Sequence, residues 1–128
     1  EELNAFYDAE RKKRDEFHEW LRPDVKAEFI QGEVVVHSPA RSKHLDVTKW
    51  LLKILDTHVA LYDLGVVKME KATVRLTRNS FEPDICFWGA QKASSFTDDQ
   101  LFFPAPDFVV EILSESTEER DRTVKKSD

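Results

Sequence analysis

The stretch APDFVVEILSES, from Ala105 to Ser116, has the composition of a buried β-strand, but Glu111 stands at its centre. Apolar residues precede and follow this glutamate. An unpaired ionised carboxylate in such a strand costs several kcal/mol, or its pKa shifts until the group is neutral. The sequence therefore predicts a partner for Glu111 elsewhere in the chain.

A second apolar run, PDICFW at residues 83–88, contains one acid, Asp84. Strands that are apolar on both faces are typical of the centre of a sheet. Period two places Asp107 and Glu111 on one face of the first strand. If the two strands are neighbours, Asp84 and Glu111 converge and repel each other unless a cation neutralises them. Mg²⁺ or Mn²⁺ suits this arrangement, because hard ions take oxygen ligands and keep waters.

The same spacing leaves a simpler arrangement open. Glu111 could form an ion pair with Arg122 or Lys125, or either acid could reach water at the end of the sheet. The residues by themselves do not decide between an ion and a salt bridge.

Periodicity predicts the elements around these strands. Charged residues with spaced apolar positions predict an amphipathic helix over residues 3–20, and AEFIQGEVVVHSP predicts a hairpin around Gly32. Apolar positions at three- and four-residue steps predict a helix from Ser42 to Tyr62 with Ser42 as N-cap. ATVRLT at residues 72–77 alternates like a half-buried strand. The core face of the long helix is expected to carry Leu45, Leu52, Leu55 and Val59.

Composition places the chain among ordinary globular proteins. It has 128 residues, which suits one α/β domain, and a net charge of −6, which does not by itself indicate nucleic-acid binding. Cys86 is the only cysteine, so an intrachain disulfide and a cysteine zinc site are excluded. Without a signal peptide or membrane-length apolar run, a cytoplasmic protein with no membrane partner is expected.

Taken together, several blocks resemble the Uma-two type of restriction endonucleases, a branch of the PD-(D/E)XK nuclease superfamily. They are EPDICFW, PAPDFVVEILSESTEERDRTVKK, KAEFIQGEVVVHSPARSKH and LGVVKMEKATVRLTRNSFEPDI. The resemblance implies an α/β (α+β), restriction-endonuclease-like fold with a central mixed β-sheet flanked by helices. It divides the chain into an N-terminal helix, residues 1–24, and a nuclease core, residues 25–128. That core is expected to be truncated, because the family pattern continues with another strand.

The resemblance also implies a set of site residues. Asp84 would be the acid of the PD element and Glu111 that of the (D/E)XK element, and both would bind Mg²⁺ or Mn²⁺. The backbone carbonyl of Ile112 and the side chain of His44 would be further ligands. On the residues alone, His44 could equally be a helix-end histidine with a local hydrogen bond. The resemblance gives supporting places to Glu28, Glu33 and His37.

The motif lysine is replaced by Leu113, which cannot polarise a phosphate. In the family a lysine from the following helix, in a DRxxK block, takes its place, and here this is Lys125, with Lys126 as the alternative. Its ammonium would stabilise charge on the phosphate or help deprotonate water. A solvated basic helix end is the plain alternative for both lysines.

Three functions are compatible with these residues. The favoured one is a metal-dependent endonuclease that hydrolyses phosphodiester bonds of DNA and acts, as related nucleases often do, as a homodimer. The second is a catalytically inactive module that keeps the fold to bind nucleic acid or protein, which Leu113 and the acidic charge support. The third is a two-carboxylate glycosidase without metal, which would need an open aromatic cleft.

Overall fold

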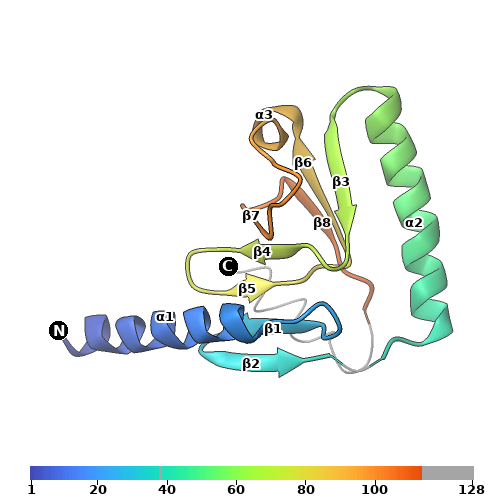
Figure 1. The fold of residues 1–128 in the computed structure, drawn as a ribbon. Helices are drawn as coiled ribbons and strands as arrows, with labels where there is room; N and C mark the ends of the chain where they lie inside the picture. The colour runs from blue at the N-terminus through green and yellow to red at the C-terminus, as the bar shows by residue number, and fades with distance from the viewer. Residues whose placement is uncertain (38, 114–128) are drawn as a thin grey trace.

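A computed structural model describes residues 1–37 and 39–113, and Figure 1 shows their arrangement. The predicted amphipathic helix, the hairpin around Gly32 and the long helix are all present. In chain order the elements are α1 (Glu2–Trp20), β1 (Ala27–Ile30), β2 (Glu33–Val36), α2 (Ser42–Leu61), β3 (Gly65–Met69), β4 (Thr73–Arg75), β5 (Ser80–Phe81), β6 (Ile85–Gly89), α3 (Ala90–Ala93), β7 (Phe102–Phe103) and β8 (Phe108–Val110).

The strands form two hydrogen-bonded groups, not one central sheet. One group has the order β2-β1-β5-β4-β7 and the other the order β3-β6-β8. The pairing of β4 with β7 is parallel and the other pairings are antiparallel, so the sheet is mixed, as predicted. The α/β (α+β) class with a mixed sheet and flanking helices is therefore confirmed, and the division into two groups is the difference.

Two chain segments cross from one group to the other. The first runs from β3 to β4 through residues 70–72, and the second runs from β5 to β6 through residues 82–84. Pro83 lies in the second crossing, and a proline interrupts a ladder because it has no N–H to donate. The crossings place Glu70 and Asp84 at the junction of the two groups, where neither residue belongs to a strand.

The core lies mainly beneath β4 and β6. Trp88 is fully buried, and its indole N–H donates to the carbonyl of Pro104 at 2.9 Å. The rings of Phe96 and Phe103 contact Trp88 with centroids 5.4 Å away in each case. A smaller cluster joins Phe17 of α1 to Phe29 of β1.

The predicted strand over residues 106–113 is shorter and more exposed than expected. β8 covers Phe108–Val110, and its described neighbour is β6, so Phe108 and Val109 are exposed. The burial prediction for this strand was wrong because apolar composition does not distinguish a central strand from one with a single described neighbour. Asp84, by contrast, is buried at the start of β6.

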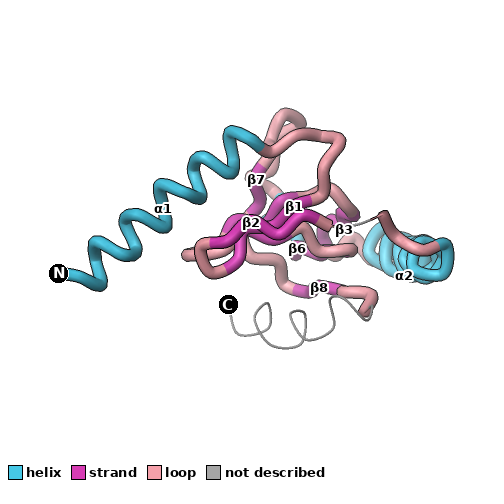
Figure 2. Tube along the Cα trace, turned by 90° about the horizontal axis from the view of Figure 1, so that it is seen from below, coloured by secondary structure: helices cyan, strands magenta, loops and turns pink. Residues whose placement is uncertain are grey.

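The two long helices differ in their surroundings. α1 extends away from the strands at its N-terminal end, whereas α2 lies alongside β3 (Figures 1 and 2). The N-cap of α2 is Arg41, so Ser42 is its first helical residue and the predicted cap is off by one position. Leu45 is exposed instead of lying on the core face, whereas Val59 is buried as predicted.

Candidate metal centre

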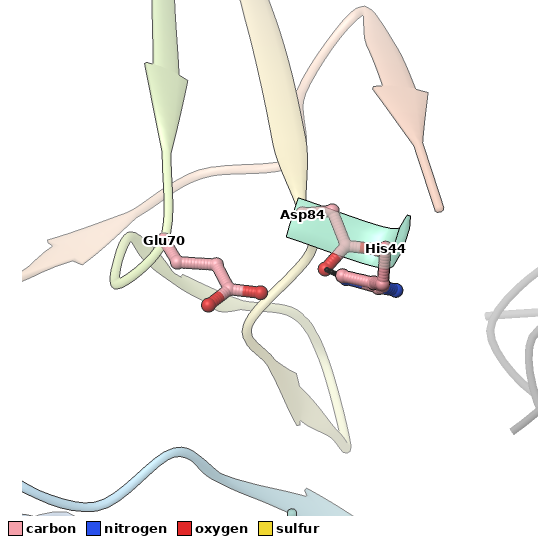
Figure 3. Close-up of side chains that lie close together, drawn as sticks. All are labelled: His44, Glu70 and Asp84. Atoms are coloured by element: carbon pink, nitrogen blue, oxygen red, sulfur yellow. Dashed lines mark ion pairs between the residues drawn. The ribbon is translucent and has the colours of Figure 1, made fainter. Parts of the chain in front are cut away.

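Three possible metal ligands meet at the junction of the two strand groups. His44 comes from the first turn of α2, Glu70 follows β3, and Asp84 precedes β6 (Figure 3). Each offers one ligand atom, and these atoms all lie within 4.8 Å of one another. Among the described residues, this is the group of three or more His, Cys, Asp and Glu side chains that could hold an ion.

Strand register explains why the two acids meet. In the ladder of β3 with β6, Met69 stands opposite Ile85, so one further step places Glu70 opposite Asp84. In the ladder of β6 with β8, Ile85 stands opposite Val110, and one further step places Asp84 opposite Glu111. Directly opposed residues project to the same face of an antiparallel pair. Continued by one residue beyond the strand ends, the two ladders would bring all three acids to the same edge.

Asp84 is held from several sides. The backbone N–H of Ile112 donates to its Oδ2 at 2.7 Å, and Lys26 Nζ lies 3.2 Å from its Oδ1. His44 Nε2 is 3.4 Å from the same Oδ1. Burial alone would raise the pKa of Asp84, but hydrogen bonds from Glu70, Ile112 and Lys26 lower it to about 2. The carboxylate is thus ionised at neutral pH.

The pKa of Glu70 moves in the opposite direction. Burial raises it, and the neighbouring carboxylate of Asp84 raises it further, while Lys26 opposes the change. Two acids at one site behave in this way because the second negative charge is disfavoured beside the first. A divalent cation would remove this repulsion.

The donor set fits Mg²⁺ or Mn²⁺. Ligands of one such ion lie about 2.0–2.1 Å from it, so their own atoms stand about 3–4.2 Å apart in an octahedron. The separations of up to 4.8 Å in this group need only side-chain adjustment to reach those values. Two carboxylates with one imidazole also match hard divalent ions better than soft ones.

The structure brings together some of the sequence-predicted residues. Asp84 and His44 belong to the group, and the backbone of Ile112 contacts Asp84 through its N–H. Glu111 is half-buried and next to Ile112, but its carboxylate is not part of the three-residue group. Lys125, like Lys126, lies outside the described residues. The metal roles of Asp84, Glu111, His44 and Ile112 stay predictions.

The supporting residues expected from the hairpin divide into two kinds. Glu28 is fully buried, where His37 Nε2 lies 2.6 Å from its Oε1 and the N–H of Glu82 donates to its Oε2 at 2.8 Å. Glu33, in contrast, is exposed at the start of β2. Glu82 is also fully buried, and burial raises its pKa to about 7. Through the hydrogen bond to Glu82, Glu28 holds the crossing that carries Asp84, and His37 contacts Glu28.

Sequence reasoning missed two residues at the centre, Glu70 and Lys26. Glu70 sits at the end of GVVKME, a mostly apolar stretch that is compatible with a strand but does not indicate which strand it pairs with. Lys26 gave no such signal, because it is a lone lysine before a short hairpin strand. Its position follows from the pairing of β1 with β5, which no local pattern reveals.

A groove of about 460 Å³ runs beside the centre. It is bounded by α2, β3 and Phe103, and it includes Met69 and Lys71, the two neighbours of Glu70, but not Glu70 itself. The groove therefore borders the acidic group and does not contain it.

Most of the chain matches a known protein family. Residues 14–128 match the Uma2 family, which is described as "Putative restriction endonuclease". This chain belongs to that family. The Uma2 match spans both crossings, the hairpin and β8, so the resemblance predicted from the sequence is confirmed. No curated protein sequence matches the chain significantly.

A solved structure supports the fold of this Uma2 chain. It is a crystal structure described as a putative nuclease belonging to DUF820 from Anabaena variabilis ATCC 29413. The TM-score is 0.71 at 19% sequence identity, over 84% of this chain and 63% of the other. The present chain thus spans under two thirds of the length of the protein it resembles. At this identity the likeness shows a shared fold.

Proposed function

We propose that this Uma2 chain is a divalent-metal-dependent nuclease that hydrolyses phosphodiester bonds in DNA as an endonuclease. The observation that supports the proposal most directly is the approach of His44, Glu70 and Asp84 to within 4.8 Å at the junction of two strand groups. Membership of a family described as restriction endonucleases agrees with it. The ion would be Mg²⁺ or Mn²⁺.

Each residue has a defined part in this proposal. Asp84 and Glu70 would hold the ion with His44, and Glu111 and the carbonyl of Ile112 would complete the ligand set from the next strand. When bound, such an ion lowers the pKa of a coordinated water and neutralises charge on the phosphate. Asp84 stays ionised through its hydrogen bonds, so it is ready to bind the cation at neutral pH. Lys125 is proposed to assist from the segment after β8.

The surface of α2 suits a nucleic-acid backbone. Lys49 and Lys53 lie 5.4 and 4.7 Å from the ring centroid of Trp50, which is exposed on the helix that also carries His44. Lysines supply salt-dependent phosphate contacts, and an exposed aromatic ring can stack on a base. In α1, by comparison, Arg14 binds the backbone carbonyls of Leu76 and Thr77, so it serves the fold.

Substitution of the acids tests the proposal. We expect Asp84→Ala, Glu70→Ala and Glu111→Ala to abolish Mn²⁺ binding, measured by calorimetry, and Mn²⁺-dependent nicking of plasmid DNA. The circular dichroism spectrum should keep its folded form. Asp46→Asn is the matched control, because it removes an exposed carboxylate from α2 near His44. Unchanged cleavage in Asp84→Ala would remove the assignment.

A non-catalytic binding module is the second candidate, and Leu113 is the observation that favours it. This residue stands at the place of the motif lysine and is 39% exposed. The two candidates differ in one measurement, since a module that has lost catalysis along with its ion would give no heat with Mn²⁺. Activity that survives EDTA would instead support the glycosidase.

A homodimer and a cytoplasmic location stay predictions from the sequence. No helix among the described residues is long and apolar enough to cross a bilayer.

A further inference from the structure

Lys26 occupies the space between the two acids of the centre. Its Nζ lies 2.5 Å from Glu70 Oε1 and 3.2 Å from Asp84 Oδ1, so one ammonium bridges both carboxylates. Its side chain is only 21% exposed. The residue immediately precedes β1, which places its backbone in the other strand group from β3 and β6.

The ammonium and a divalent ion would compete for the same two carboxylates. A cation shared by Glu70 and Asp84 would lie within a few ångströms of the ammonium that now contacts both carboxylates, and two cations at that distance repel each other. In the metal-free protein, the lysine therefore neutralises two partly buried carboxylates, which is the effect that a bound ion would have. An ion that takes Glu70 Oε1 or Asp84 Oδ1 therefore displaces Lys26 from that oxygen.

Neighbouring lysines have other contacts. Lys71, next to Glu70, donates to the backbone carbonyls of Arg22 and Val25, and Lys68 lies over the ring of Phe103 at 5.4 Å. At the motif position Leu113 offers no cation. Among the described lysines, Lys26 is thus the one that the structure shows in contact with both acids.

We infer that Lys26 is the active-site lysine of this chain: it neutralises Glu70 and Asp84 before a divalent ion binds, and afterwards it contacts the scissile phosphate. This inference rests on the proposed function. Once released from the acids, a flexible four-carbon side chain keeps its ammonium beside the centre, where a phosphate bound to the ion would lie. Lys26, immediately before β1, then supplies the positive charge that Leu113 does not.

The first test measures Mn²⁺ affinity by calorimetry at fixed salt. Lys26→Met removes the charge, keeps an unbranched side chain only one atom shorter and adds only a soft thioether, which is a poor ligand for Mn²⁺. We expect it to bind Mn²⁺ at least about tenfold more tightly than the unmodified chain, because a competing cation has gone. Lys68→Met is the matched control, since it removes a nearby charge that does not contact the acids, and its affinity should stay within about twofold.

The second test measures DNA cleavage at saturating Mn²⁺. Lys26→Met should lower kcat by about 10²-fold, the usual cost of losing one group that stabilises charge in the transition state. Lys26→Arg keeps the charge, so it should retain part of the activity. For the same reason it should bind Mn²⁺ about as weakly as the unmodified chain. If Lys26→Met does not fold, Lys26→Gln, which also removes the charge but keeps a polar end, makes the same comparison.

The outcomes separate this inference from the proposed function. Tighter Mn²⁺ binding with slower cleavage supports both roles of Lys26. Equal or weaker Mn²⁺ binding in a folded Lys26→Met chain overturns the inference, and undiminished kcat overturns the phosphate contact. If the unmodified chain binds no Mn²⁺ although it is folded, the proposed metal-dependent function itself fails.

Discussion

Gly65 lies where a side chain has no room. Its φ is +149°, and a Cβ at this position would lie 2.0 Å from the backbone carbonyl oxygen of Trp88. Backbone atoms cannot move aside as the end of a side chain can. The close approach of β3 to β6, which sets the register that brings Glu70 to Asp84, therefore requires glycine here.

Alanine at this position should be strongly destabilising. We expect Gly65→Ala to lower the free energy of unfolding by more than about 3 kcal/mol, because the strand pair must separate to admit the methyl group. Its cross-strand partner Gly89 provides the control. There the nearest atom to an added Cβ is Asp107 Oδ2 at 3.3 Å, and Gly89→Ala should cost less than about 1 kcal/mol. Urea titration of both variants gives the comparison, and equal midpoints would contradict it.

At the same scale, Asp84 and Lys26 show what a sequence can predict. Asp84 was identifiable because an acid in an apolar run requires a partner. Lys26 was not, because a lysine beside a polar turn is ordinary in any chain and becomes unusual only when folding surrounds it with two carboxylates. Glu70 is intermediate, since its neighbours predict a strand but do not predict that the strand pairs with β6.

Among the elements, α1 carries a buried acid, Glu10, that pairs with Arg78 between β4 and β5. Glu10 is 6% exposed and accepts two hydrogen bonds from Arg78, from Nε to Oε1 at 2.6 Å and from a terminal nitrogen to Oε2 at 2.9 Å. The hydrogen bonds from Arg78 lower the pKa of Glu10 below its ordinary value of 4.5, although burial acts against them. Ionised Glu10 therefore stabilises the attachment of α1.

The sign of this pKa shift predicts a pH dependence. Because the pKa of Glu10 is lower in the folded chain than in the unfolded one, its contribution is present above about pH 4.5 and is lost as the pH falls through the folded value. Glu10→Gln should lower the free energy of unfolding by about 1.5–3 kcal/mol at pH 7. The difference from the unmodified chain should shrink below pH 4, as followed by thermal unfolding.

The control for this element is Asp8, which pairs with Arg11 on the exposed side of the same helix. Both side chains of that pair are more than 60% exposed. Asp8→Asn should therefore change the free energy of unfolding by less than about 0.5 kcal/mol at any pH. A loss as large as that of Glu10→Gln would mean that α1 responds to charge in general and not to this buried pair.

The molecule as a whole should couple metal binding to stability. The proposed ligands come from α2, β3, the start of β6 and the residues after β8, so an unfolded chain cannot present them together. An ion that binds only the folded chain at 100 times its Kd adds about 2.7 kcal/mol to the free energy of unfolding. We expect Mn²⁺ to raise the thermal midpoint of the unmodified chain and to leave that of Asp84→Ala unchanged. Equal shifts in both would place the ion elsewhere.

At this scale, the elements were predictable but their grouping was not. Period and composition indicated both long helices, the hairpin and the strand pair that carries Asp84 and Glu111. The division into two strand groups depends on the crossings at residues 70–72 and 82–84. Each crossing is only a few residues long. Apart from Pro83, these residues carry no sequence pattern that predicts a crossing, because its position depends on packing between strands that are distant in sequence.

The chain segment that connects β6 to β8 begins and ends at nearly the same place in the sheet. The N–H of Gly89 donates to Asp107 Oδ2 at 2.7 Å, and the N–H of Asp107 donates to the carbonyl of Phe87 at 2.9 Å. Its tip, at Asp98 and Asp99, is exposed. An exposed loop tip tolerates the insertion of a whole domain when the two ends of the loop lie close together. A sequence-reading module joined between these two aspartates would thus leave the strand ladders of the metal centre intact, making this tip the natural place to engineer target choice.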